Sequence, residues 1–113
     1  GPISNEGILE NIIAMSELAK ANNIKVILCS VLPANRFNWN PKISPANRVI
    51  ELNKMIQSFA DKNKIIYVDY FSQMVDDENG LQKQYGEDGV HPNKEGYLVM
   101  KTIVNEAIER ISN

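Results

Sequence analysis

The chain has few of the residues on which small proteins build covalent or metal-based cross-links. Among its 113 residues there is one cysteine and one histidine. A single cysteine cannot form a disulfide within the chain, and zinc sites favour several His or Cys ligands, so neither a disulfide nor a zinc centre is expected to hold the fold together. Cys29 stands within an apolar run, and we expect it to be a small buried side chain rather than a reactive thiol.

The chain also lacks an excess of charge of one sign and a long hydrophobic run. Its 12 basic and 14 acidic residues give a formal net charge of -2, without a block of like charges. Nothing in this balance favours nucleic acid or an anionic membrane as a partner, so we expect neither. The longest apolar run, IKVILCSVLPA, is far shorter than the roughly 20 residues that cross a bilayer. We therefore expect a soluble protein with no membrane span.

The patterns that are present alternate between helix and strand. Apolar residues at three- and four-residue spacing predict a helix over residues 7–21 and a second one over residues 45–62. Each is followed by an almost continuously apolar stretch, residues 24–32 and 64–70, which is typical of strands buried on both faces of a parallel sheet. Together these segments predict a βαβ unit preceded by a helix.

The rest of the chain consists of two connections and a last helix. Residues 33–47 hold three prolines and four asparagines, so they predict an ordered loop. Residues 71–92 are predicted to be mostly irregular, with a turn at Asn79–Gly80. Pro92 or Asn93 opens the last helix. The apolar stripe of that helix comprises Tyr97, Met100, Val104, Ala107, Ile108 and Ile111.

The predicted order of helix, strand, helix, strand, helix is half of a doubly wound α/β sheet. Two adjacent parallel strands leave unpaired edges, and isolated two-stranded sheets are marginally stable. Further strands are therefore expected from outside this chain, or the edge is covered by self-association.

Ligands of open parallel sheets bind at the carboxyl ends of the strands. In this chain those ends lead into the two connections, so Asn35, Trp39, Asp88 and His91 are expected at one edge of the sheet. Trp39, together with Phe37, either lines a pocket there or pins the loop to the core. The sequence leaves both interpretations open.

Asp88 and His91 are three residues apart across a glycine in the segment GEDGVHPNKEGY. This spacing suits a carboxylate that accepts the Nδ1 proton of the histidine on the same turn and leaves Nε2 free as a base. An Asp-Gly pair followed by His-Pro is also common in a noncatalytic turn that leads into a helix. Spacing alone leaves both interpretations open.

A metal site is the other candidate at this edge, formed from acidic residues and the one histidine. Its potential ligands are Asp69, Asp76, Asp77, Asp88 and His91. This set is a poor match to zinc, and Asp76 and Asp77 are typical of a solvated loop or a helix cap. We therefore expect no metal.

Asp88, His91, Pro92 and Gly96, set before an amphipathic helix, resemble the last block of the SGNH or GDSL hydrolases, which are esterases with a flavodoxin-like fold. Upstream, IKVILCSVLPA is similar to the strand and loop of that family. The segment VIELNKMIQSFADKNKIIYVDYFSQMVDDENGL is similar to its helix, strand and Y-x-D turn. The whole chain, residues 1–113, thus resembles a single partial domain: the C-terminal half of a three-layer α/β/α flavodoxin-like hydrolase.

The resemblance implies hydrolysis of carboxylic esters by a Ser-His-Asp triad. His91 would act as general base and then as acid, while Asp88 orients it and stabilises the imidazolium. The implied substrate is a small-molecule ester, with acetyl groups on carbohydrate among the candidates, and no cofactor is implied. Asn35 and Trp39 are the candidate substrate contacts. The implied setting is a soluble bacterial protein, secreted, periplasmic or cytoplasmic.

The chain departs from the family pattern because it has neither the Gly-Asp-Ser block that carries the nucleophile nor the Gly-x-Asn-Asp block of the oxyanion hole. Asn35 and Asn47 lack that oxyanion context. None of the serines stands in the nucleophile context, and none is nominated: Ser4, Ser16, Ser30, Ser44, Ser58, Ser72 and Ser112. The chain alone is therefore expected to lack serine-esterase activity. The alternative is a noncatalytic module that binds a ligand or partner at the same edge.

Overall fold

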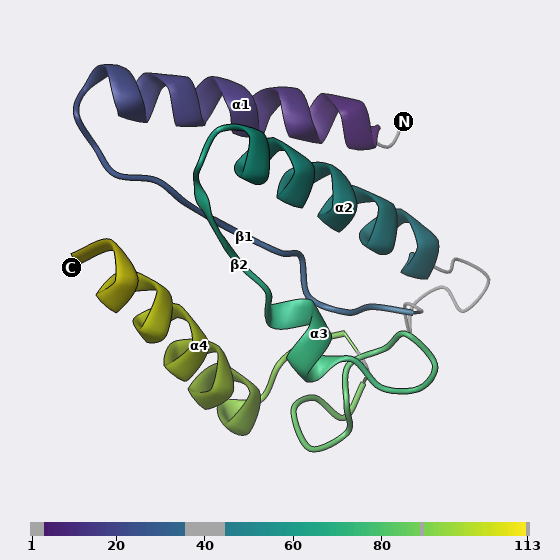
Figure 1. Ribbon diagram of the computed structural model, residues 1–113. Helices are drawn as coiled ribbons and strands as arrows, with labels where there is room; N and C mark the ends of the chain where they lie inside the picture. The colour runs from purple at the N-terminus through teal and green to yellow at the C-terminus, as the bar shows by residue number, and fades with distance from the viewer. Residues whose placement is uncertain (1–3, 36–44, 89, 113) are drawn as a thin grey trace.

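A pair of short parallel strands with helices on both sides forms the centre of the structure (Figure 1). This computed structural model describes residues 4–35, 45–88 and 90–112. Its elements are α1 (Asn5–Ala21), β1 (Ile27–Cys29), α2 (Ala46–Lys62), β2 (Ile66–Val68), α3 (Tyr70–Met74) and α4 (Lys94–Ser112). α2 and α4 lie on opposite sides of the strands, and α1 packs on α2. The predicted α/β class with parallel strands is confirmed.

α1 begins earlier than predicted because Ser4 caps it. The Ser4 hydroxyl accepts the N–H of Gly7 at 3.0 Å, which satisfies one of the free donors at the helix start. At the other end, the Asn22 N–H donates to the carbonyl of Ala19 at 3.1 Å. Asn23 then adopts a left-handed backbone, with φ of 61°, which asparagine tolerates better than most residues. This turn directs the chain into β1.

β1 and β2 pair over three residues each, which is shorter than the predicted strands over residues 24–32 and 64–70. The register pairs Ile27 with Ile66, Leu28 with Tyr67 and Cys29 with Val68. Among the described residues, β1 has a strand beside it only on the β2 side, so the ladder is short. The prediction that Cys29 is buried was wrong: it is exposed, because it lies at the end of a strand whose outer edge no described strand covers.

A side chain of α2 takes the place of a neighbouring strand at the end of β1. The Ser30 N–H donates to the Val68 carbonyl at 2.9 Å, and because backbone groups alternate along a strand, those of Cys29 and Val31 face the outer edge. Asn53, which is buried, accepts the Val31 N–H at 2.7 Å and donates to the Val31 carbonyl at 3.1 Å. The open edge of β1 therefore ends at Val31.

The apolar stripes agree with the sequence prediction in α2 but only in part in the other helices. α2 buries Val49, Leu52, Ile56 and Ala60. In α4, Ala107 is buried, but Tyr97 is 59% exposed and Ile108 is 47% exposed. The prediction that Tyr97 and Ile108 face the core was wrong. The two described strands cover only part of the apolar face of α4.

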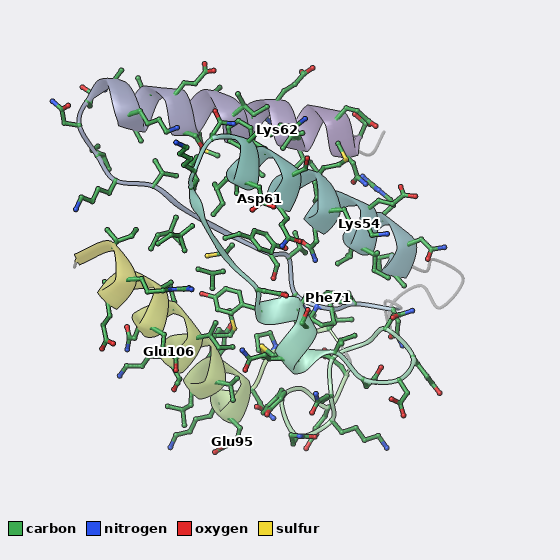
Figure 2. All side chains as sticks on the ribbon, in the orientation of Figure 1. Lys54, Asp61, Lys62, Phe71, Glu95 and Glu106 are labelled. Carbon is green, nitrogen blue, oxygen red and sulfur yellow. The ribbon has the colours of Figure 1, made fainter. Side chains whose placement is uncertain are left out.

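The connection after β2 is more regular than predicted. Asp69 caps α3: its carboxylate accepts the N–H of Ser72 at 2.9 Å and the Ser72 hydroxyl at 2.6 Å. Phe71 lies on α3 (Figure 2). Its N–H donates to the hydroxyl of Ser30 at 3.0 Å. Tyr70 and Met74 from this helix enter the core, so the prediction of a mostly irregular segment was wrong here.

A small hairpin follows α3. Val75 and Leu81 form an antiparallel bridge. Between them, the carboxylate of Asp76 accepts the N–H groups of Glu78 and Gly80, both at 2.8 Å. The predicted turn at Asn79–Gly80 is confirmed, and Asn79 has a φ of 64°. The hairpin delivers the chain to the loop before α4.

We predict that Asn53→Leu lowers the free energy of unfolding by about 1–3 kcal/mol, because it removes the buried amide that bonds the partly buried N–H and carbonyl of Val31. Urea unfolding followed by circular dichroism measures this. The matched control is Asn63→Ala, which removes an exposed asparagine that donates to the Phe59 carbonyl, and it should change stability by no more than about 0.5 kcal/mol. Equal losses in the two variants would contradict the prediction.

Candidate active site

The carboxyl ends of β1 and β2 lead to the side of the molecule where α3, the hairpin and the loop before α4 gather (Figure 1). Asp88 and His91 lie in that loop. Asn35 reaches the same side, where its amide donates to the Glu78 carbonyl at 3.1 Å. Asn35 and Asp88 both line a small hollow of about 110 Å³. Phe37 and Trp39 lie outside the described residues, and Asn35 makes no hydrogen bond to His91 in the described part of the chain.

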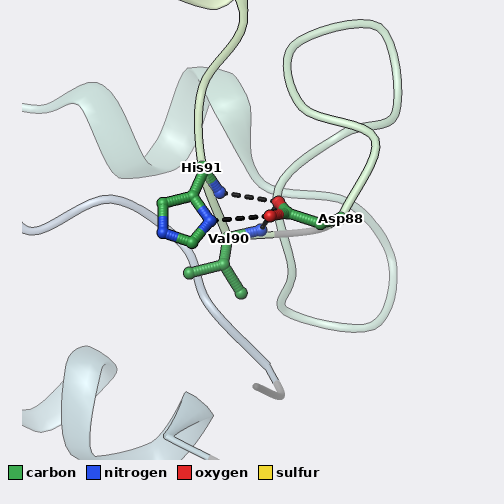
Figure 3. A network of polar contacts seen from close by, with 3 residues as sticks. All are labelled: Asp88, Val90 and His91. Atoms are coloured by element: carbon green, nitrogen blue, oxygen red, sulfur yellow. Dashed lines mark hydrogen bonds and ion pairs between the residues drawn. The ribbon is translucent and has the colours of Figure 1, made fainter. Parts of the chain in front are cut away.

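The carboxylate of Asp88 organises the loop through three short hydrogen bonds (Figure 3). Its Oδ1 accepts the backbone N–H groups of Val90 at 2.9 Å and His91 at 2.7 Å. Its Oδ2 lies 2.6 Å from Nδ1 of the His91 ring. The same turn thus fixes the backbone of His91 and the orientation of its ring.

These hydrogen bonds set the ionisation of Asp88. The backbone N–H of His91, the His91 ring and the N–H of Val90, in that order, lower the pKa of Asp88 from 3.8 to about 2. The carboxylate is therefore charged throughout the neutral range and acts only as an acceptor. Because it can only accept, Nδ1 carries the ring proton, and Nε2 of the neutral ring keeps a free lone pair.

Nε2 is accessible. The His91 side chain is 80% exposed, while that of Asp88 is 32% exposed. This arrangement can accept a proton at Nε2 and stabilise the resulting imidazolium through the charged carboxylate. It has the geometry of the acid–base half of a catalytic triad.

Glycine makes a close contact possible behind the histidine. A Cβ on Gly86 would lie 2.4 Å from the His91 carbonyl oxygen, and a Cβ on Gly96 would lie 2.6 Å from the Tyr85 carbonyl oxygen. Side chains cannot approach backbone so closely, so both positions require glycine for packing. The segment that carries His91 is therefore seated directly against the preceding turn.

The other acidic residues have local structural roles. Asp69 caps α3 and Asp76 closes the hairpin turn. Within the described residues, no group of three or more His, Cys, Asp or Glu side chains is arranged to hold a metal ion. The same described residues contain no helix with the length and apolarity needed to cross a bilayer.

Three of the described serines form hydrogen bonds away from His91. Ser30 accepts from Phe71, Ser72 donates to Asp69, and the Ser16 hydroxyl donates to the Ile12 carbonyl at 2.9 Å. In the described part of the chain, the only hydrogen-bond partner of the His91 ring is Asp88.

Asn93 was identified from the sequence only as a possible helix start. Its Oδ1 accepts the N–H of Gly96 at 2.9 Å, and its Nδ2 donates to the Gln84 carbonyl at 3.1 Å. An asparagine just before a helical stripe is a capping signal. No local sequence pattern predicts the hydrogen bond from Asn93 Nδ2 to the carbonyl of Gln84, nine residues earlier.

The profile of the GDSL-like lipase/acylhydrolase family matches residues 1–99. The chain belongs to this family. Its fold and the resemblance read from the sequence are thereby confirmed. No curated protein matches the chain.

Solved structures from the same family superpose closely. A Bacteroides fragilis protein described as an acylhydrolase is 43% identical, with a TM-score of 0.93 over 100% of this chain. A GDSL-like lipase of Bacteroides thetaiotaomicron is 44% identical, with a TM-score of 0.91 over 98% of this chain. The chain spans 55% of the length of each of these two proteins.

A more distant structure shares the fold alone. The esterase domain of a zebrafish retrotransposon ORF1 protein is 15% identical, with a TM-score of 0.75, and the match covers 97% of this chain and 62% of that one.

We predict that the Asp88 carboxyl titrates with a midpoint near 2 rather than 3.8. Because the folded-state pKa is lowered, the stabilisation it provides is present above about pH 4 and is lost as the pH falls through about 2. Carbon-detected NMR of the side-chain carboxyl measures the midpoint. In His91→Ala the midpoint should rise but stay below 3.8, since both backbone donors remain. An unchanged midpoint in that variant would show that the ring bond contributes nothing.

Proposed function

We propose that this chain supplies the acid–base half of an ester hydrolase, with Asp88 and His91 as two members of a Ser-His-Asp triad. The observation that carries the proposal is the 2.6 Å contact between Asp88 Oδ2 and His91 Nδ1, together with an exposed Nε2. A serine hydroxyl is a weak nucleophile until a positioned base removes its proton. The family membership supports this chemistry.

The proposed reaction needs a serine from a segment outside this chain. His91 Nε2 takes the hydroxyl proton while the serine oxygen attacks the ester carbonyl carbon. The imidazolium, stabilised by Asp88, then gives that proton to the leaving alcohol as the carbon–oxygen bond breaks. A water molecule repeats the sequence, releases the acid and restores the serine.

The chain is proposed to be the C-terminal part of the hydrolase domain. Its match to 55% of the length of the two Bacteroides proteins supports a partial domain, and the resemblance of residues 88–96 to the last block of the family supports the C-terminal assignment. Under this proposal, the nucleophile and the oxyanion donors come from the remaining part of the domain.

A small polar ester, such as an acetyl group on carbohydrate, is the proposed substrate. The position of Asn35 beside the hollow that reaches Asp88 supports a polar contact there. Trp39 is kept as a proposed contact from the sequence alone. No cofactor is needed for this chemistry.

A noncatalytic module that binds a ligand at the same edge is the second candidate, because no described serine is hydrogen-bonded to the His91 ring. His91→Ala separates the two candidates, since only the enzyme requires Nε2 as a base.

We predict no serine-inhibitor-sensitive turnover of p-nitrophenyl acetate by the 113-residue chain alone, because the nucleophile and oxyanion hole supply much of the rate. In a longer protein that carries this chain and the rest of the domain, turnover is expected. There His91→Ala should lower kcat by about 10²–10⁴-fold without loss of folding. Glu109→Ala, at an exposed position of α4 that does not line the hollow beside Asp88, is the control and should retain kcat. Full turnover by the His91→Ala variant would favour the noncatalytic module.

We also predict self-association of the isolated chain through the outer edge of β1, because unpaired strand edges pair with other strands. Sedimentation velocity should show a dimer or larger species. Cys29→Lys places a charge beside that edge at an exposed position and should shift the chain toward monomer. A folded chain that stays monomeric at all concentrations would contradict this proposal.

A further inference from the structure

The loop that carries Asp88 and His91 is bonded internally and packs against Gly86, but few hydrogen bonds of its described residues reach the rest of the protein. Within the described residues of the segment 87–93, the hydrogen bonds of Asp88 all stay inside the loop. Of the described residues in this segment, only Asn93 makes hydrogen bonds that reach the preceding turn. Its N–H donates to the Tyr85 carbonyl at 2.7 Å, and its Nδ2 donates to the Gln84 carbonyl at 3.1 Å.

The Asn93 side chain is held at both ends. While Nδ2 reaches Gln84, Oδ1 accepts the N–H of Gly96 at 2.9 Å and caps α4. The amide therefore joins the turn at Gln84 to the first turn of α4. In the sequence, His91 lies between Gln84 and the start of α4, two residues before Asn93. Its carbonyl oxygen packs against Gly86.

We propose that Asn93 is a positioning residue, whose side-chain amide fixes the Asp88–His91 pair relative to the strand ends and so sets the direction of Nε2. This rests on the proposed function. Because the pair is bonded internally, a change in its attachment would displace both side chains together. A displacement of about 1 Å at a catalytic group can cost on the order of 10²-fold in rate.

Two substitutions separate this role from helix capping. Asn93→Asp keeps an acceptor for the Gly96 N–H but replaces the donor that faces the Gln84 carbonyl with an acceptor. Asn93→Ser also keeps a capping oxygen and removes the donor. The matched control is Asn63→Asp, which replaces an amide that donates to the Phe59 carbonyl at 2.9 Å, at the end of α2.

The first readout uses the 113-residue chain. Backbone ¹⁵N relaxation should show that the order parameters of Val90 and His91 fall from about 0.85 to below about 0.6 in both Asn93 variants. In Asn93→Ser, which adds no charge near Asp88, the Asp88 titration midpoint should stay as in the unsubstituted chain, since the bonds inside the loop remain. A role limited to capping predicts unchanged order parameters, and that result would overturn the proposal. If Asn93→Asp does not fold, Asn93→Ser decides the same question.

The second readout uses the longer protein that carries this chain. Asn93→Asp should lower kcat about 10²-fold with little change in KM, while Asn63→Asp retains kcat. Unchanged kcat in Asn93→Asp, where His91→Ala is inactive, would overturn the role of Asn93 and leave the proposed function standing. If His91→Ala is fully active, the proposed function fails, and the relaxation measurement still decides whether Asn93 holds the loop.

Discussion

The pairing of β1 with β2 ends at Ser30, whose N–H donates to the Val68 carbonyl at 2.9 Å and whose hydroxyl accepts the Phe71 N–H at 3.0 Å. This one residue connects the end of β1 to the end of β2 and to the start of α3. Asn53 then holds Val31 from the side of α2. Because the two parallel strands end at paired residues, Cys29 and Val68, the connections that follow them leave the sheet at the same edge. The site is formed at that edge.

The site itself depends on a second, more local constraint. The Asp88 carboxylate binds two backbone N–H groups and the ring of His91, so the position of the ring follows from the shape of a four-residue turn. Such a turn can hold its shape without the core. Its place relative to the strand ends is a separate matter, determined by the glycine contacts and by Asn93.

The two free surfaces of the chain fit one explanation within the proposed function. The His91 side chain is 80% exposed, and no described strand pairs with the outer edge of β1. A nucleophile must approach the first surface, and a strand would pair with the second. A segment that supplied both would complete the domain, in keeping with relatives nearly twice as long as this chain.

The sequence by itself determined the features that rest on contacts between residues close together in the chain. The buried stripe of α2 and the turn at Asn79–Gly80 follow from spacings of a few residues, and the spacing of Asp88 and His91 allows the pairing that the structure shows. Only the tertiary structure decided the exposure of Cys29 and Tyr97, because exposure depends on which elements lie alongside. It also decided the bonds of Asn53 to Val31 and of Asn93 to Gln84, since hydrogen bonds between distant segments leave no periodic pattern in the sequence.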